Sequence, residues 1–394
     1  MVAYGNDGMD YGFSMIRTMM RLIGVWPLQQ NFICTFRWIL VFITESLTVM
    51  GLLIDYFKNC GDIKDNLEFF LMIDSCFHAW INVISARVYM KRIAVNVSSA
   101  MDDWSLSTEK QSYVIMMRYA KLGRIITILH LMIGVIAAPL YYVSTFTGSK
   151  QQVVTIGNDT TILWNFVIPA SCLFKEISYS TYKAILVLQI LQGLLVYTAE
   201  CASDSFFFAI TMHLCGQLEL LRIRFVEIER QIADRNHYRN FLRPWIRRHN
   251  KLIILAKNIE DSFNLTLLIR LSIITIVIAV SGMRLIVSVK HQNYTDVVKS
   301  ITFIQLSFVQ SFMFTHAGDT LRNQSESIVL AIHDSTWHKF SPSAMKDLIF
   351  IMMRTNIPLQ LTAGKFFYIT RSTMTDILKT ALTYISFLQV TMTE

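Results

Sequence analysis

The chain has 394 residues, of which 53% are hydrophobic and only 16% are charged. A soluble domain usually carries about a quarter charged residues, so this composition excludes an ordinary soluble enzyme of two or three domains. Proline is scarce (6) and phenylalanine abundant (26), which also excludes a disordered chain, a collagen and a disulfide-rich secreted module. The remaining class is a polytopic membrane protein, and its formal net charge of +8 must be assigned to one side of the bilayer.

Seven stretches are long and apolar enough to cross a bilayer core of about 30 Å, which needs roughly 20 helical residues. Helices are expected, because lipid leaves no backbone group unpaired and ten-residue alternating strands are absent from the sequence. We predict an all-α membrane protein that forms one domain over residues 1–394, with no cleavable signal peptide. The predicted spans are Trp38–Phe57, Leu67–Ala86, Ile125–Thr147, Ala184–Cys215, Leu265–Val289, Ile301–Gly318 and Phe366–Val390.

The positive charges indicate the orientation. With the N-terminus in the cytoplasm, the inside segments hold 22 Lys and Arg residues and the outside loops hold 7, and the remaining 7 of the 36 lie in or beside spans. Cytoplasmic loops carry the excess of basic residues in membrane proteins, so we predict a cytoplasmic N-terminus and an extracellular C-terminus. The basic run Arg243–His249 is then a contact for the inner membrane leaflet, and no nucleic-acid partner is expected.

The outer halves of spans two, three, four and six have the composition of a ligand pocket, which is mostly apolar and aromatic with a few polar groups. The candidates in each span lie three or four residues apart and so share one helix face. Such walls would bind a small hydrophobic, volatile or lipid-like molecule by burial, whereas ordinary helix packing is the alternative. The candidate residues are Phe70, Ile73, Phe77, Ala138, Tyr142, Leu188, Gln192, Ile304 and Phe308.

Charged residues inside the spans are expected to face the interior of the bundle or to reach toward the membrane surface, because a charge in hydrocarbon is costly. They are Glu45, Asp74, Glu200, Asp204, Arg270, Arg284 and Arg371.

Motifs for catalysis, metals and cofactors are absent: there is no His-Glu-x-x-His, no paired Cys-x-x-Cys, no P-loop and no Gly-x-Ser-x-Gly. We predict a protein that is not an enzyme and has no cofactor or metal. Cys60 and Cys172 fall on the predicted outer side. They could form a disulfide bridge there, or they could be two separate buried thiols. The other four cysteines are expected to be small apolar packing residues: Cys34, Cys76, Cys201 and Cys215.

The fourth span is predicted to continue into the cytoplasm as one long helix with a heptad-like apolar seam. This seam consists of Leu214, Leu218, Leu221, Phe225, Ile228 and Ile232. A second apolar face precedes the fifth span and consists of Leu252, Ile253, Leu255, Ala256, Ile259 and Phe263. Together they predict a helical cytoplasmic platform, with helices lying flat on the inner leaflet as the alternative.

The last span carries a polar stripe, because residues alternately three and four apart share one side of a helix. Its members are Thr373, Asp376, Thr380, Thr383, Phe387 and Val390. A lipid-facing stripe would not carry a carboxylate, so this side faces protein or water. One interpretation is a polar seam between helices. The other is a pore wall that Phe387 and Val390 close near the outer mouth, since hydrophobic constrictions can gate a channel by dewetting.

Several segments resemble the insect odorant receptor family, most clearly in the C-terminal third. The last span and its approach carry Pro358-Leu-Gln-Leu-Thr-Ala-Gly-Lys-Phe-Phe367 and Thr383-Tyr-Ile-Ser-Phe-Leu-Gln-Val390. A second match is Met212-His-Leu-Cys-Gly-Gln-Leu-Glu219, after the run Glu200-Cys-Ala-Ser-Asp-Ser-Phe206, and a third is Gly318-Asp-Thr-Leu321. The length, the seven spans and the inside N-terminus also match.

This resemblance implies a ligand-gated, non-selective cation channel that assembles as a tetramer around a central pore. It implies ligand-binding helices mainly in residues 33–216, a cytoplasmic anchor with spans five and six in 217–365, and a pore-lining span in 366–394. The pore and gate residues would be Asp376, Thr380, Thr383, Phe387, Val390 and Thr391. The chain lacks the long second cytoplasmic insertion of the family's co-receptor. It therefore resembles a tuning subunit that pairs with that co-receptor in a heterotetramer, in the plasma membrane of a sensory neuron dendrite.

A seven-helix G-protein-coupled chemoreceptor is the alternative function. It would require the opposite orientation, and the sequence has no Asp-Arg-Tyr after span three and no proline in span seven. A transporter is disfavoured because the chain shows no internal repeat.

Overall fold

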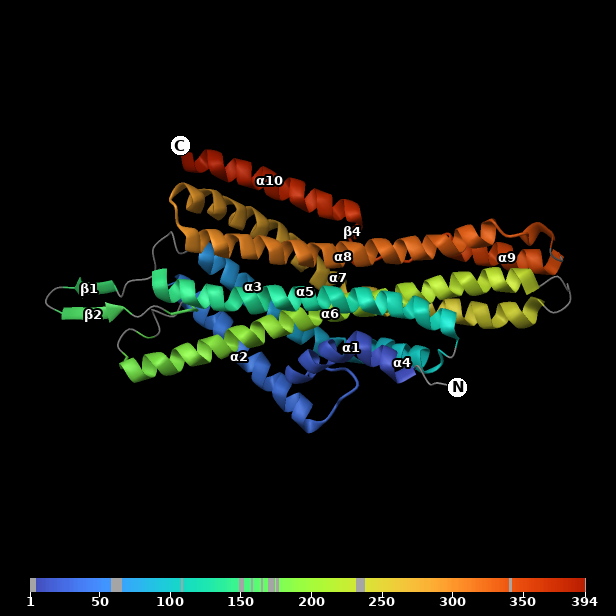
Figure 1. The fold of residues 1–394 in the computed structure, drawn as a ribbon, viewed down its shortest axis with the longest axis horizontal. Coiled ribbons are helices and arrows are strands. Elements are labelled where there is room, and N and C mark those ends of the chain that lie inside the picture. The colour runs from blue at the N-terminus through green and yellow to red at the C-terminus, as the bar shows by residue number, and fades with distance from the viewer. Residues whose placement is uncertain are drawn as a thin grey trace.

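The fold is described by a computed structural model that covers residues 5–57, 66–107, 109–148, 152–156, 159–163, 166–168, 174, 177–231, 238–339 and 342–393. Long α-helices dominate it and run along the long axis of the molecule (Figure 1). The helices are α1 (Gly5–Leu22), α2 (Phe32–Phe57), α3 (Asn66–Val88), α4 (Met90–Ser105), α5 (Lys110–Gly148), α6 (Tyr179–Gln231), α7 (Tyr238–Lys290), α8 (Tyr294–His333), α9 (Pro342–Thr355) and α10 (Arg371–Thr393). Four short strands pair as β1 (Gln152–Ile156) with β2 (Asp159–Leu163) and β3 (Thr362–Ala363) with β4 (Phe367–Tyr368).

Six of the described helices are long and apolar enough to cross a membrane: α2, α3, α5, α6, α7 and α8. They contain the first six predicted spans. The seventh predicted span corresponds to α10, whose polar stripe lowers its hydropathy. The protein is therefore a multi-pass membrane protein built from helices, as the sequence predicts.

The predicted start of the last span at Phe366 is wrong, because α10 begins at Arg371. The preceding residues form the small β3–β4 hairpin, whose turn places Gly364 and Lys365 at φ values of 59° and 63°. This left-handed conformation ends any helical path between the hairpin strands. Thr373 then caps the new helix, since its hydroxyl accepts a hydrogen bond from the Thr370 amide and donates one to the Tyr368 carbonyl.

Helices α6 and α7 each have 53 residues and are about 80 Å long at 1.5 Å per residue, far more than a bilayer core requires. They confirm the prediction that span four continues as one helix. Most residues of the two predicted apolar faces are buried. In the same region, Trp245 of α7 donates a 2.9 Å hydrogen bond to the Leu221 carbonyl of α6. Ile232, at the end of the predicted seam, lies outside the described residues.

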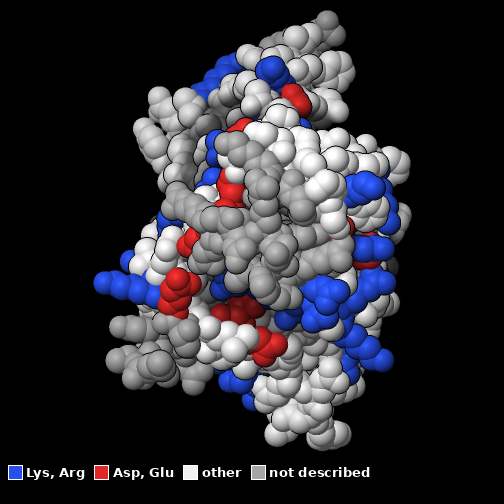
Figure 2. Space-filling view, turned by 90° about the vertical axis from the view of Figure 1, so that its right-hand side faces the viewer, with Lys and Arg blue, Asp and Glu red and all other residues white. Residues whose placement is uncertain are grey.

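The two ends of the molecule differ in structure. The hairpin β1–β2 lies at the same end as the C-terminus of α10, whereas the N-terminus lies toward the end where α6, α7, α8 and α9 come together (Figure 1). Seen from this second end, Lys and Arg side chains gather around the face with acidic side chains between them (Figure 2). This end therefore carries many basic side chains, and its cytoplasmic location stays a prediction.

The predicted packing cysteines Cys34, Cys76, Cys201 and Cys215 are buried as free thiols. Cys60 and Cys172 lie outside the described residues, so their proposed alternatives stay predictions.

An ion cluster ties three helices together at the basic end. Asp103 of α4 lies 2.7 Å from the Arg248 guanidinium of α7 and 3.2 Å from the His213 ring of α6. The Asp103 side chain is only 6% exposed. Burial alone would raise its pKa, but the hydrogen bonds and charges of His213 and Arg248 outweigh burial and hold it below the usual value of 3.8.

We predict that Asp103→Ala destabilises the protein by roughly 2–3 kcal/mol, because it leaves a largely buried guanidinium without its carboxylate. The lowered pKa means that the stabilisation is complete above the usual carboxyl pKa and is lost as the pH falls through the lower folded-state value. Thermal unfolding of purified protein at pH 7 and below pH 3.8 measures both effects. Asp102→Ala is the matched control, since Asp102 is exposed and adjacent. Equal melting temperatures for the two variants at pH 7 would contradict the prediction.

Candidate functional site

An apolar cavity of about 210 Å³ lies among α3, α5, α6 and α8. Its walls are mainly aliphatic, and among its lining residues only Glu200 and Lys299 carry a charge. The lining consists of Leu71, Met72, Ser75, Cys76, Gly134, Ala137, Ala138, Tyr142, Val167, Ile168, Gln189, Gly193, Val196, Tyr197, Glu200, Val298, Lys299, Thr302, Phe303 and Leu306. This composition is typical of a site for a small, mostly apolar molecule.

Two glycines make room for the two tyrosines of the cavity wall. A Cβ atom on Gly134 of α5 would lie 1.9 Å from the Tyr197 ring of α6. A Cβ atom on Gly193 of α6 would lie 2.6 Å from the Tyr142 hydroxyl of α5. Each helix therefore lacks a side chain where the other helix places an aromatic ring. The Tyr197 hydroxyl also donates a hydrogen bond to the His130 carbonyl, which fixes the orientation of its ring.

Two residues that precede α6, Val167 and Ile168, form part of the cavity wall. The Gln189 side chain of α6 accepts a hydrogen bond from the Ile168 amide at 3.2 Å and donates one to the Ile168 carbonyl at 2.9 Å. The Phe166 ring packs edge-to-face against Tyr182. These contacts hold Val167 and Ile168 against the cavity, and both residues line it.

The predicted ligand residues separate into two groups. Ala138 and Tyr142 line the cavity. The other seven are outside its lining: Ile73, Gln192 and Ile304 are partly buried, whereas Leu188 (64%), Phe70 (50%), Phe308 (48%) and Phe77 (40%) have exposed side chains. The spacing of residues identifies a shared helix face but does not say whether that face points inward or toward lipid.

Sequence reasoning missed Gly134, Gly193, Tyr197 and Glu200 as parts of the wall. Of these four, Glu200 could have been predicted, because an acidic residue within a membrane span is expected to face the interior of the bundle.

A buried polar network begins at Glu200 and extends through the bundle. Its Oε1 atom lies 3.5 Å from the Arg270 guanidinium of α7 and 3.3 Å from Nδ1 of His78 of α3. Arg270 also lies 3.8 Å from Asp204, one turn beyond Glu200 on α6, and the Gln310 amide of α8 donates a 3.2 Å hydrogen bond to Asp204. All five side chains are buried, which confirms the expected inward orientation of Glu200, Asp204 and Arg270.

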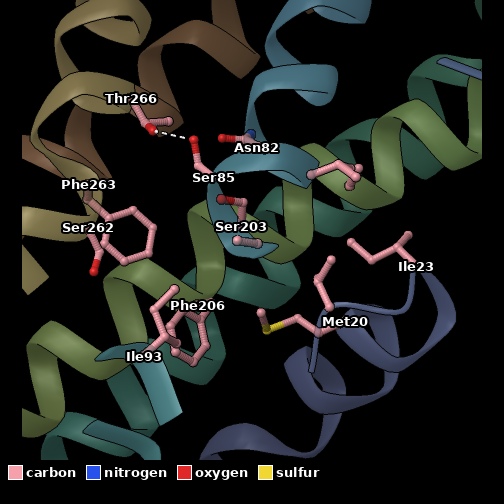
Figure 3. A pocket seen from close by; sticks show the side chains of 14 residues that line it. Met20, Ile23, Asn82, Ser85, Ile93, Ser203, Phe206, Ser262, Phe263 and Thr266 are labelled. Carbon is pink, nitrogen blue, oxygen red and sulfur yellow. Dashed lines mark hydrogen bonds between the residues drawn. The ribbon is translucent and has the colours of Figure 1, made fainter. Parts of the chain in front are cut away.

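A second, much smaller cavity of about 20 Å³ is lined by residues of α1, α3, α4, α6 and α7. Asn82 of α3 lines it, and its side-chain nitrogen lies 3.2 Å from Nδ1 of His78. Figure 3 shows Thr266 of α7 joined to Ser85 of α3 by a hydrogen bond of 3.5 Å in the cavity wall, with Met20 and Phe206 below them in this view. The space suffices for one water molecule and excludes an organic ligand. The larger cavity is therefore the candidate ligand site.

The polar stripe of α10 faces away from the rest of its own chain. Asp376, Thr380 and Thr383 are exposed, and Phe387 and Val390 are 65% and 58% exposed. Thr373 is the exception, since it is buried as the helix cap. The opposite side of α10 is covered, because Ile377 and Ala381 are buried and Ile385 packs close to Gly282 of α7. Thr391 lies in α10, but its side chain is outside the described set.

The base of α10 is fixed by contacts with α7 and α8. Glu260 of α7 accepts hydrogen bonds from the amide and the hydroxyl of Thr362 in β3. Arg371, at the start of α10, pairs with Asp319 of α8 at 3.0 Å. A Cβ atom on Gly318 would lie 2.3 Å from the Ile369 carbonyl oxygen, so only glycine allows this close approach. The polar stripe is thus held on a helix whose position depends on α7 and α8.

Comparisons of this chain with known sequences and structures point to one group of relatives. Residues 63–382 match the family model described as "7tm Odorant receptor". Odorant receptor 13a of Drosophila melanogaster is 27% identical over 212 residues, which cover 50% of each chain. Odorant receptor 47a of the same species is 31% identical over 101 residues, or 24% of this chain and 26% of the relative. The matched stretches thus span about half the length of the curated relatives, or less.

The fold is also similar to solved structures. The insect olfactory receptor OR5 from Machilis hrabei aligns with a TM-score of 0.79 at 13% identity and covers 96% of this chain and 99% of its own. The same receptor in complex with eugenol gives a TM-score of 0.77 over 97% and 100% of the two chains. At this identity the likeness concerns the fold. Because the family model covers most of the chain, this protein belongs to the seven-transmembrane odorant receptor family, whose members are receptors and not enzymes.

Proposed function

We propose that this chain is the ligand-tuning subunit of an odorant-gated, non-selective cation channel. It would act in the plasma membrane of a sensory neuron dendrite, paired with an odorant co-receptor in a heterotetramer. A ligand in the cavity among α3, α5, α6 and α8 opens a central pore lined by α10. The observation that carries this proposal is the outward polar stripe of α10, in a helix whose other side packs on its own chain.

The stripe supports a pore because a membrane helix with one exposed polar side needs water or a partner helix on that side. Its exposure shows that no described helix of this chain supplies the cover. Around a symmetric central axis, such stripes from several subunits would face one another across a channel. Asp376 would attract permeating cations, and the Phe387 and Val390 side chains would form an apolar constriction nearer the outer end.

The cavity supports a small volatile ligand. An engineered apolar protein cavity of about 150 Å³ accepts benzene, so about 210 Å³ suits one ring with a short substituent or an alkyl chain of similar volume. Burial of apolar surface would supply most of the affinity, at about 25 cal/mol per Å².

The proposal is tested by recording currents from cells that express this chain with and without an odorant co-receptor, while a panel of small volatiles is applied. Excised patches without guanine nucleotides separate the two signalling classes. A ligand-gated channel keeps its response in them, whereas a G-protein-coupled receptor loses it. An epitope tag on each terminus, read on intact cells, tests the orientation. An outside N-terminus would contradict the proposal.

We predict that Phe387→Ala, in the presence of the co-receptor, increases the basal current or changes ion selectivity, because it removes bulk from the apolar constriction. Leu382→Ala is the matched control: Leu382 is 62% exposed on the same helix but lies well away from the stripe. Currents are normalised to surface expression. If the Phe387 variant keeps wild-type basal current and selectivity, the stripe is a seam between helices.

We predict that Tyr142→Ala changes the rank order of activating ligands, because it enlarges the cavity and removes a hydroxyl from its wall. Leu188→Ala should leave the rank order unchanged, since Leu188 is 64% exposed on the outward side of α6. Dose–response curves for at least six volatiles compare the two variants. A changed ranking for Leu188→Ala alone would place the ligand elsewhere.

A further inference from the structure

Glu200 belongs to the cavity wall and to the buried network at the same time. It lines the larger cavity, and its Oε1 atom contacts Arg270 and His78, which do not line that cavity. The side chain is 3% exposed, so a ligand in the cavity is the partner it can meet apart from protein. It is the one acidic residue among the cavity's lining residues.

The Glu200 carboxylate offers a ligand only one kind of hydrogen bond. A carboxylate only accepts hydrogen bonds. The nearby Tyr197 hydroxyl is already engaged with the His130 carbonyl, and the Gln189 amide is engaged with Ile168. At the carboxylate itself, a ligand oxygen that can only accept, such as that of an aldehyde, ester or ether, would meet a negative charge and receive no hydrogen bond; other polar lining residues are Ser75, Tyr142, Lys299 and Thr302. A buried polar group left unpaired costs more than a hydrogen bond contributes.

The charge balance argues for a neutral donor. Arg270 already lies close to Glu200 and Asp204, so the carboxylate does not need a cationic ligand. An ammonium group would also lose its hydration in a cavity with mainly aliphatic walls, which is costly. A hydroxyl group supplies a donor without that cost.

We propose that Glu200 makes this receptor selective for small ligands that carry a hydroxyl group, such as alcohols and phenols, over matched ligands that can only accept hydrogen bonds. The ligand hydroxyl donates to the Glu200 carboxylate, while the rest of the ligand fills the apolar part of the cavity. This inference rests on the proposed function, because it assigns the ligand class of the same cavity.

The test uses compounds of nearly equal size: benzyl alcohol, benzaldehyde, benzyl methyl ether and benzylamine. They are applied to cells that express this chain with a co-receptor, both alone and in competition with the strongest agonist of the volatile panel. Since a hydrogen bond to a charged group is stronger than a neutral one, we expect the alcohol to act at a concentration about tenfold or more below those of the aldehyde and the ether. We expect benzylamine to be weaker than the alcohol.

Two variants assign the preference to Glu200. Glu200→Gln keeps the size of the side chain but adds an amide donor, so the alcohol-to-aldehyde ratio should fall toward one. Asp204→Asn is the matched control, because Asp204 also contacts Arg270 but does not line the cavity, and the ratio should stay within about twofold of wild type. Ratios within one variant are independent of surface expression. If Glu200→Gln does not reach the surface, Glu200→Asp, with its carboxylate withdrawn by one methylene, should lower the ratio.

The outcomes separate the two proposals. The hydroxyl selectivity is overturned if the activating concentrations of the alcohol and the ether lie within threefold of each other, or if benzylamine is preferred. In either case the channel function stands. If Asp204→Asn changes the ratio as much as Glu200→Gln does, the preference belongs to the whole network and not to Glu200. If no compound of the panel evokes a current with the co-receptor, the proposed channel function fails.

Discussion

The charge of Arg270 is the constraint on which the arrangement of the bundle depends. A guanidinium within a membrane span must be paired, because hydrocarbon offers it neither water nor counter-ions. Glu200 and Asp204, one turn apart on α6, provide the two carboxylates. His78 of α3 lies beside Glu200, and Gln310 of α8 donates a hydrogen bond to Asp204. Four helices are thereby fixed in register at one depth of the bundle by groups that would each be costly if left alone.

Such a network specifies positions more sharply than apolar packing does. Leucine and isoleucine faces of membrane helices can slide along one another with little loss, since lipid tails are as apolar as the side chains. Hydrogen-bond geometry does not allow that freedom. The cavity lies directly outside this network, where paired small residues and tyrosines, Gly134 with Tyr197 and Gly193 with Tyr142, keep α5 and α6 at a fixed spacing.

The sequence predicted the coarse structure well, because long apolar segments and loop charges are direct consequences of the bilayer. It also predicted the continuous α6 and the buried charges Glu200 and Arg270. It failed where the answer depends on rotation or on a backbone turn. The spacing of residues makes Leu188 and Tyr142 equally good candidates for the ligand site. In the structure Leu188 is exposed, whereas Tyr142 lines the cavity. The start of α10 was misplaced, because the positive φ values at Gly364 and Lys365 leave no trace in hydropathy.

Helix α7 makes direct contacts both at the cavity wall and with α10. Arg270 pairs with Glu200 at the cavity wall, Gly282 packs against Ile385 of α10, and Glu260 anchors the hairpin that precedes α10. The three contacts lie on one uninterrupted helix, so a displacement of the α7 backbone at Arg270 would be felt at Glu260 and Gly282 as well. In the proposed channel, a ligand that displaces the Glu200 carboxylate would act on the helix that also holds α10 and its polar stripe. These contacts form a continuous series of packed elements between the cavity wall and α10.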